Sequence, residues 1–231
     1  MCGRYVAAQD PGALVEEFDV DDAVTEALGP DFNMAPTKRA YVVTRSESSE
    51  DPTRTLAIAR WGLVPSWAKD PSIGPRLINA RCETVAEKPS FRSAFARRRC
   101  LVPAEGYYEW RGEPGAKQPF FLSAAEGGLL AMAGIFEWWL DRGRAPDDPG
   151  ARWLTFAILT REAVGPAAQI HDRMPVMVQS VHRDAWLDPA FDASRALAEC
   201  TVPPLVAVPV STAVNSVRNN GPHLIRPMAS G

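Results

Sequence analysis

Residues 100–140 read CLVPAEGYYEWRGEPGAKQPFFLSAAEGGLLAMAGIFEWWL, and they determine the class of structure that we expect. The stretch holds four apolar runs of strand length, rich in aromatic and branched side chains and separated by Gly, Pro and charged residues. A fifth run, WLTFAIL, follows at residues 153–159. Five such runs in close succession predict a strand-rich core.

Around this core the sequence predicts short helices, further strands and surface loops. Residues 11–18 follow Asp10, a good N-cap, and place Pro11 at the first helical position, so a helix is expected there. Other helices are expected at residues 77–87, 90–98, 182–187 and 194–199. Further strands are expected at residues 1–8, 41–44, 55–64 and 205–210. Residues 31–37 are expected to form a turn, residues 45–53 and 141–150 surface loops, and residues 229–231 a frayed tail.

Length and composition limit the class of protein and the number of domains. The chain has 231 residues, of which 46% are hydrophobic and 23% charged, and 21 are prolines, which disfavour long helices. We therefore expect one α+β domain over residues 1–231. No apolar run is long enough to cross a membrane, and the N-terminus does not read as a secretory signal, so we expect a cytoplasmic monomer. With no CxxC pair and three histidines, we expect neither a metal site nor another cofactor.

Charge is unevenly distributed along the chain, although the net charge is only −3. Residues 9–31 hold eight acidic residues and no basic one, whereas residues 60–111 hold ten basic and five acidic residues. A local excess of positive charge indicates either an anionic partner or simply a solvated basic face.

Cys2 is the first candidate for chemistry. Removal of Met1 is expected because cysteine is a small second residue, and it would leave an α-amine and a thiol on the same residue. Both groups titrate close to neutral pH when exposed, so both would be partly nucleophilic. Such an aminothiol can act as an N-terminal nucleophile, or it can trap an aldehyde as an imine that the thiol closes to a thiazolidine. The alternative is that Cys2 is only the second residue of a strand.

Glu109 and His171 are candidates for proton transfer. Glu109 ends an apolar run between aromatic residues, which should partly desolvate its carboxylate and raise its pKa. His171 lies in a short polar segment between two apolar runs, and histidine is the usual proton carrier at neutral pH. An edge-strand glutamate facing solvent and a hydrogen-bonded structural histidine are the alternatives. His182 and His223 are expected to be structural.

Several residues are suited to a nucleic acid. Asn79 and Arg81 are expected at a helix start, where backbone N–H groups and an arginine would bind phosphate. Trp67 and Trp110 flank the same basic region, and rings interleaved with arginines suit single-stranded nucleic acid. Core packing is the alternative for every tryptophan, and we expect it for Trp61, Trp138, Trp139 and Trp153. Residues 97–99, three arginines, are expected to form a solvated face.

Eight short motifs, in order along the chain, resemble those of one protein family, the SRAP (SOS response-associated peptidase) domains. They are CGRY at 2–5, NMAPT at 33–37, WGLVPSW at 61–67, NARCET at 79–84, RRCLVPA at 98–104, YYEW at 107–110, IHDRMP at 170–175 and VN…NGP at 214–222. The resemblance covers residues 2 to about 226. Cys82 stands where relatives often carry alanine.

The resemblance implies a fold and a function. The fold would be a compact α+β domain with curved, barrel-like mixed sheets and short flanking helices. The function would be a covalent thiazolidine crosslink to abasic sites in single-stranded DNA, including those at single-/double-strand junctions. Cys2 would attack, Asn79 would orient the sugar, Glu109 would move protons and His171 would open the sugar, the last two also supporting reversal of the crosslink. Arg4, Trp67, Arg81, Trp110 and Arg173 would line the DNA path.

Two other function classes remain open on the sequence. A thiol autopeptidase or N-terminal nucleophile hydrolase would also use Cys2, but it needs an oxyanion hole that the sequence does not reveal. A non-catalytic single-strand binding module would need the tryptophans and arginines without Cys2 or Glu109.

Overall fold

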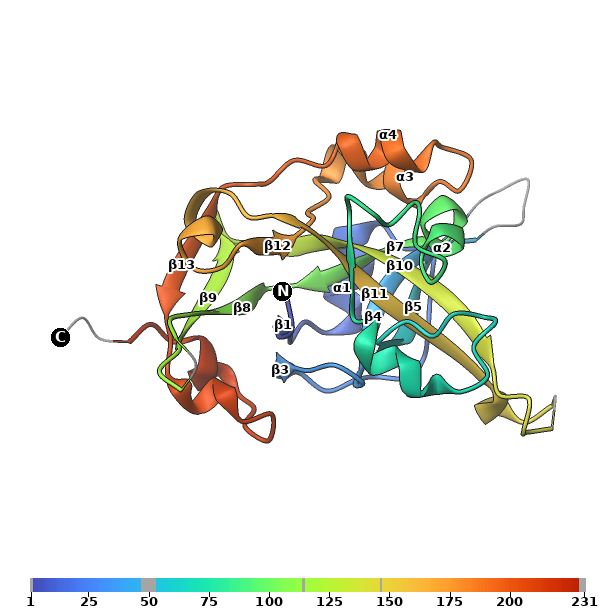
Figure 1. The fold of residues 1–231 in the computed structure, drawn as a ribbon, viewed down its shortest axis with the longest axis horizontal. Helices are drawn as coiled ribbons and strands as arrows, with labels where there is room; N and C mark the ends of the chain where they lie inside the picture. The colour runs from blue at the N-terminus through green and yellow to red at the C-terminus, as the bar shows by residue number, and fades with distance from the viewer. Residues whose placement is uncertain (1, 47–52, 114, 146, 229–231) are drawn as a thin grey trace.

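Two β-sheets and a set of short helices make up the structure, a computed structural model that describes residues 2–46, 53–113, 115–145 and 147–228 (Figure 1). The α+β class with barrel-like mixed sheets, expected from the sequence, is confirmed. Among the described residues we find no helix with the length and apolar character that crossing a membrane requires.

Five strands close into a barrel. In order around the ring, they are β11 (Arg152–Glu162), β10 (Leu130–Leu140), β7 (Arg99–Ala104), β4 (Arg39–Arg45) and β5 (Arg54–Trp61). Neighbours are antiparallel except at the closure, where β5 runs parallel to β11 with Arg60 opposite Thr155. The ring is mixed because only this closing pair is parallel.

A second, antiparallel sheet packs against the barrel. In order across the sheet, its strands are β13 (Leu205–Pro209), β9 (Gln118–Ala124), β8 (Gly106–Arg111), β1 (Tyr5–Ala7) and β3 (Asp31–Met34). Since successive side chains of a strand point to opposite faces, the barrel strands contribute to two apolar clusters. One cluster joins Val102 and Phe156 of the barrel to Tyr107 of the second sheet, and the other joins Leu101 to the helices.

Helices are short and lie outside the sheets. The α-helices are α1 (Pro11–Phe18), α2 (Arg92–Arg97), α3 (Arg183–Leu187) and α4 (Ala193–Ala198). The 3₁₀-helices are η1 (Pro71–Arg76), η2 (Pro149–Ala151), η3 (Gly165–Gln169), η4 (Ser180–His182), η5 (Thr212–Asn215) and η6 (Pro222–Ile225). Asp10 caps α1 by accepting from the Ala13 N–H at 3.1 Å, as predicted. α2, α3 and α4 bury Phe95 and Trp186 in the second apolar cluster, which accounts for their amphipathic sequences.

Three minor strands extend the barrel sheet, and one of them, together with β3 of the second sheet, corrects our expectations. They are β2 (Asp22–Ala23), β6 (Asn79–Arg81) and β12 (Arg173–Pro175). The helix expected at residues 77–87 is wrong, because β6 pairs in parallel with β11 and turns follow it. The turn expected at residues 31–37 is wrong in its first half, where β3 pairs with β1. In both segments, hydrogen bonding to a neighbouring strand outweighs the local preference.

The loop between β5 and β6 positions β6 beside β11. Gly62 has φ +122° and its backbone approaches that of Gly74 so closely that a Cβ on Gly62 would lie 2.7 Å from the Gly74 carbonyl oxygen. Leu63 donates to the Leu77 carbonyl at 3.1 Å, which closes the base of the loop. After this loop, β6 pairs in parallel with β11, as β5 does before it.

Two further expectations are corrected by burial. Trp61 and Trp139 are buried as expected, but Trp138 is 40% exposed and Trp153 is half-buried. Arg99, expected in a solvated face, is buried with its guanidinium bonded to backbone carbonyls. Part of the predicted loop at residues 45–53, namely 47–52, and the predicted tail at residues 229–231 lie outside the described residues.

Candidate active site

Cys2 lies three residues before β1. Its side chain is fully buried in the apolar cluster that joins the barrel to the second sheet. Burial raises the pKa of the Cys2 thiol far above its ordinary value, and the charge of Glu109 raises it further. Burial thus disfavours the thiolate form of Cys2 in the folded chain.

Asn79 contacts Cys2 directly. Its Nδ2 donates to the Cys2 carbonyl at 2.7 Å, which links β6 to the segment that precedes β1. Its Oδ1 is buried and accepts no hydrogen bond from the described residues. The amide is thus held through its Nδ2 by Cys2, while its Oδ1 is left to accept a hydrogen bond. The helix start expected at Asn79 is wrong, because Asn79 lies in the strand β6. The strand nevertheless places Asn79 in contact with Cys2.

Glu109 and His171 line the same cleft. Glu109, in β8, is 4% exposed, and burial raises the pKa of its carboxyl, while the charge of His171 acts in the opposite direction. Because its pKa is raised, this carboxyl is suited both to donating and to accepting a proton. His171 is half-buried, and its Nδ1 accepts from the Arg173 N–H at 3.0 Å and lies 2.7 Å from Asp172 Oδ1.

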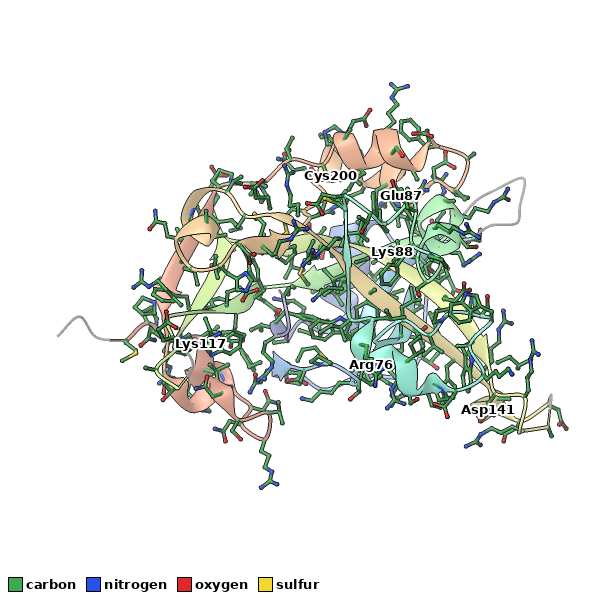
Figure 2. The ribbon with its side chains drawn as sticks, viewed as in Figure 1. Arg76, Glu87, Lys88, Lys117, Asp141 and Cys200 are labelled. Carbon is green, nitrogen blue, oxygen red and sulfur yellow. The ribbon has the colours of Figure 1, made fainter. Side chains whose placement is uncertain are left out.

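The cleft has a volume of about 810 Å³ and opens beside these two residues. It is lined by Arg4, Glu109, Trp110, Gly115, Ala116, Lys117, Gln118, His171, Thr212 and Asn215. Figure 2 labels Lys117 on the turn between β8 and β9, close to the C-terminal segment. The cleft is therefore formed where the β8–β9 turn, the segment around His171 and η5 meet.

One wall of the cleft depends on contacts between distant parts of the chain. Arg4 donates to Asn33 Oδ1 at 2.6 Å and to the Val214 carbonyl at 2.9 Å, and its guanidinium lies 5.8 Å from the Trp110 ring. Trp110 in turn donates from Nε1 to Asn215 Oδ1 at 2.7 Å. Arg4 and Trp110, both expected on a DNA path, thus reach the same cleft as Glu109.

The other three residues expected to contact DNA lie elsewhere. Arg81, in β6, is exposed, and its guanidinium has no hydrogen-bond partner among the described residues. Trp67 is 59% exposed in the turn that follows β5. Arg173 is already engaged: it forms a two-bond ion pair with Glu83 at 2.7 and 2.9 Å, and this bonding lowers the pKa of Glu83 to about 2.

Sequence reasoning did not find every residue of the site. Lys117, Gln118 and Thr212 line the cleft, but the sequence around them carries no chemical signature. Asn33 and Asn215 were within the quoted motifs, yet only the contacts above explain what they do. Among the described residues, no group of three or more His, Cys, Asp or Glu side chains is placed to hold a metal ion.

Comparison with known proteins shows which family this chain resembles. The family profile for SOS response associated peptidase (SRAP) matches residues 1–217. The abasic site processing protein YoqW of Bacillus subtilis is 36% identical over 231 residues, covering 97% of this chain and 99% of that protein. The E. coli abasic site processing protein YedK is 32% identical over 99% of this chain and all of its own length.

A solved structure shares the fold. A protein from Bacteroides thetaiotaomicron superimposes with a TM-score of 0.84 at 24% identity, covering 98% of this chain and all of the other. The fold, the matched profile and the full-length relatives converge on one assignment. The chain belongs to the SOS response associated peptidase (SRAP) family.

Proposed function

We propose that this protein processes abasic sites in single-stranded DNA by forming a covalent crosslink through Cys2. The observation that carries the proposal is the convergence on Cys2 of an oriented amide, Asn79, and a buried carboxyl of raised pKa, Glu109, at a cleft that His171 also lines. The full-length relatives named abasic site processing proteins support the same assignment.

The chemistry requires the α-amine of Cys2, and so we propose that Met1 is removed. The sugar of an abasic site opens to an aldehyde, and the amine adds to it to give a carbinolamine. Loss of one water leaves an imine. The thiol sulfur then bonds to the imine carbon, its proton passes to the nitrogen, and a thiazolidine results. The balance is aldehyde plus aminothiol giving thiazolidine plus one water.

The side chains take separate parts in this sequence. Asn79 Oδ1, with its partner position open, would accept from a hydroxyl of the sugar. Glu109 would donate a proton as the carbinolamine loses water and accept the thiol proton as the ring closes, because its raised pKa suits both transfers. His171, on the same cleft, would act on the sugar oxygen during opening. The same two groups would serve reversal.

Arg4 and Trp110 would contact the strand beside the abasic site, since both line the cleft. Arg81 would bind phosphate with its exposed guanidinium, and Trp67 would offer its exposed ring to a base. Arg173 would contribute by holding Glu83 and the His171 segment in place, through its ion pair and its backbone N–H.

A thiol peptidase is supported less well. A nucleophilic cysteine in a peptidase needs an accessible thiolate, whereas Cys2 is fully buried and the pKa of its thiol is strongly raised. A route in which the amine attacks first makes no such demand, because the thiol enters as S–H with Glu109 to take its proton.

Intact mass spectrometry tests the proposal. Protein purified from its native cell is incubated with a single-stranded oligonucleotide carrying one abasic site. We expect the mass of protein without Met1 plus oligonucleotide minus one water, and loss of the adduct in Cys2→Ala. Cys82→Ala, which removes a half-buried thiol outside the cleft, serves as the matched control and should crosslink like the parent. A retained Met1, or an adduct that survives Cys2→Ala, would refute the mechanism.

A further inference from the structure

We propose that a groove at the far end of the barrel is a second binding surface for single-stranded DNA, distinct from the cleft around Glu109. The groove has a volume of about 830 Å³ and lies between β2, β5 and the paired ends of β10 and β11. It is lined by Ala23, Val24, Thr25, Glu26, Arg39, Ala57, Ile58, Arg60, Trp138, Arg152, Trp153 and Leu154.

Two arginine–tryptophan pairs form the groove. The Arg152 guanidinium lies 4.3 Å from the Trp138 ring centre, and the Arg60 guanidinium lies 5.0 Å from that of Trp153. Trp138 is 40% exposed in spite of its place on a long, mostly buried strand. Large exposed rings held by guanidinium groups are a feature of surfaces that stack nucleobases.

The charge of the groove is positive. Arg39 is paired with Glu26 at 2.6 and 2.9 Å, so these two residues neutralise each other. Arg60 and Arg152 have no hydrogen bond or ion pair through their guanidinium groups among the described residues. Stacking uses the flat face of a guanidinium and leaves its N–H donors at the edge, where they can bind phosphate oxygens in pairs.

One β-strand of the protein, β11, runs from the groove to the site around Cys2. β11 begins at the groove with Arg152 and Trp153 and passes Asn79, which is opposite Ile158. At about 3.3 Å per residue, the five residues from Trp153 to Ile158 span about 17 Å. Stacked nucleotides repeat about every 3.4 Å, so about five of them cover this distance. The inference rests on the proposed function in one respect: it expects the same DNA strand to occupy both this groove and the cleft around Glu109.

Single-stranded DNA fits these observations better than a protein partner. Tryptophan and arginine also mark protein interfaces, but there the charge at the centre is normally matched and desolvated. Here two guanidinium groups are unmatched by carboxylates and lie beside accessible rings. The repeating pattern of phosphate and base in a single strand satisfies both groups at once.

Binding is measured by fluorescence anisotropy with oligonucleotides that carry a reduced abasic site, which has no aldehyde and cannot crosslink. One oligonucleotide extends about three nucleotides on each side of that site and the other about twelve, so that only the longer one spans the groove. The variants are Arg60→Gln/Arg152→Gln and Trp138→Leu. Arg92→Gln/Arg195→Gln removes the same charge from exposed positions on α2 and α4 and serves as the matched control.

We expect the arginine variant to bind the longer oligonucleotide with a salt slope reduced by about 1.4, about 0.7 for each lost phosphate contact. Trp138→Leu should weaken that binding by at least about fivefold with the salt slope unchanged, because it removes a stacked base. Binding of the short oligonucleotide should not change. Equal effects on both lengths, effects matched by the control, or no effect at all would overturn the proposal. None of these readouts depends on crosslinking, so a failure of the proposed function is seen separately.

Discussion

Burial of ionisable groups is the dominant feature at the scale of single residues. Cys2 and Glu109 are both almost inaccessible to solvent, and desolvation is the largest cause of the raised pKa of each. Burying a carboxyl makes its ionisation unfavourable for the folded state, but a raised pKa suits a group that must give and take protons. Cys2 and Glu109, to which we assign chemical roles, are thus residues whose burial makes their ionised forms unfavourable in the folded state.

Glu109→Gln should reveal that cost. A carboxyl whose pKa is raised on folding binds its proton more tightly in the folded state than in the unfolded one. Its contribution to stability is therefore fully present below its unfolded pKa of about 4.3, and is lost as pH rises toward the folded pKa. Glutamine cannot ionise, so the variant should gain stability relative to the parent as pH rises over that interval.

Urea unfolding between pH 4 and 8 measures this difference, with exposed Glu126→Gln as the control. The same Glu109 variant should crosslink about 100- to 10,000-fold more slowly, the usual contribution of a general acid/base group. Parallel pH profiles for parent and Glu109→Gln would contradict the role of burial, and an unchanged rate would contradict the role in proton transfer.

At the scale of elements, Arg99 organises the helices on one side of the barrel. It begins β7, and its guanidinium donates to the carbonyls of Trp186, Phe95, Ala96, Asp188 and Phe191. These carbonyls belong to α2, α3 and the turn before α4. One side chain therefore satisfies carbonyls of three helical segments that are too short to be stable alone.

Arg99→Met should destabilise the protein by at least about 3 kcal/mol. Methionine keeps most of the apolar volume, but several buried carbonyls lose their donor, at about 1–3 kcal/mol for each buried acceptor that finds no other partner. Arg97→Met, at an exposed position of α2, should change the unfolding free energy little. Chemical denaturation followed by circular dichroism compares them, and equal midpoints would show that Arg99 is dispensable.

At the scale of the whole molecule, the cleft exists because the two ends of the chain meet. Asn33 donates from Nδ2 to the carbonyls of Ser216 and Asn219, both at 2.9 Å, and accepts from Arg4. These bonds connect β3 and the segment before β1 to the C-terminal segment beyond β13, which Figure 1 shows beside β3 and β9. η5, which carries two cleft residues, is held through this junction.

Asn33→Ala should loosen the C-terminal segment and one wall of the cleft. The loss of its hydrogen bonds should reduce the unfolding free energy by about 2–3 kcal/mol, since each contributes about 0.5–1.5 kcal/mol and Arg4 also loses its partner. Amide exchange over residues 212–219 should accelerate, as measured by mass spectrometry. Glu126→Gln, at an exposed position outside this junction, is the control. Exchange that is unchanged in Asn33→Ala would show that the junction is not what holds η5.

Much of the fold could be predicted from the sequence, because local chemistry is enough to produce it. The strand-rich core at residues 100–159 follows from runs of apolar residues of strand length, and α1 follows from Asp10 and Pro11. Cys2, Glu109 and His171 were also candidates on residue type alone. The desolvation of Glu109 was expected from its aromatic neighbours and is confirmed.

Other features were decided only by the tertiary structure, because they depend on partners far away in the chain. Residues 77–87 have helical character by themselves, but β11 supplies a free edge that makes Asn79–Arg81 a strand. The sequence indicates that Arg99 is one of three surface arginines, but in the structure its guanidinium donates to five backbone carbonyls. The sequence likewise indicates that Trp138 is a core residue, but it lies near the end of β10 and is 40% exposed. The site itself joins Cys2, Asn79 and Glu109, residues up to 107 positions apart in number, whose common position exists only after the barrel has closed and the second sheet has packed against it.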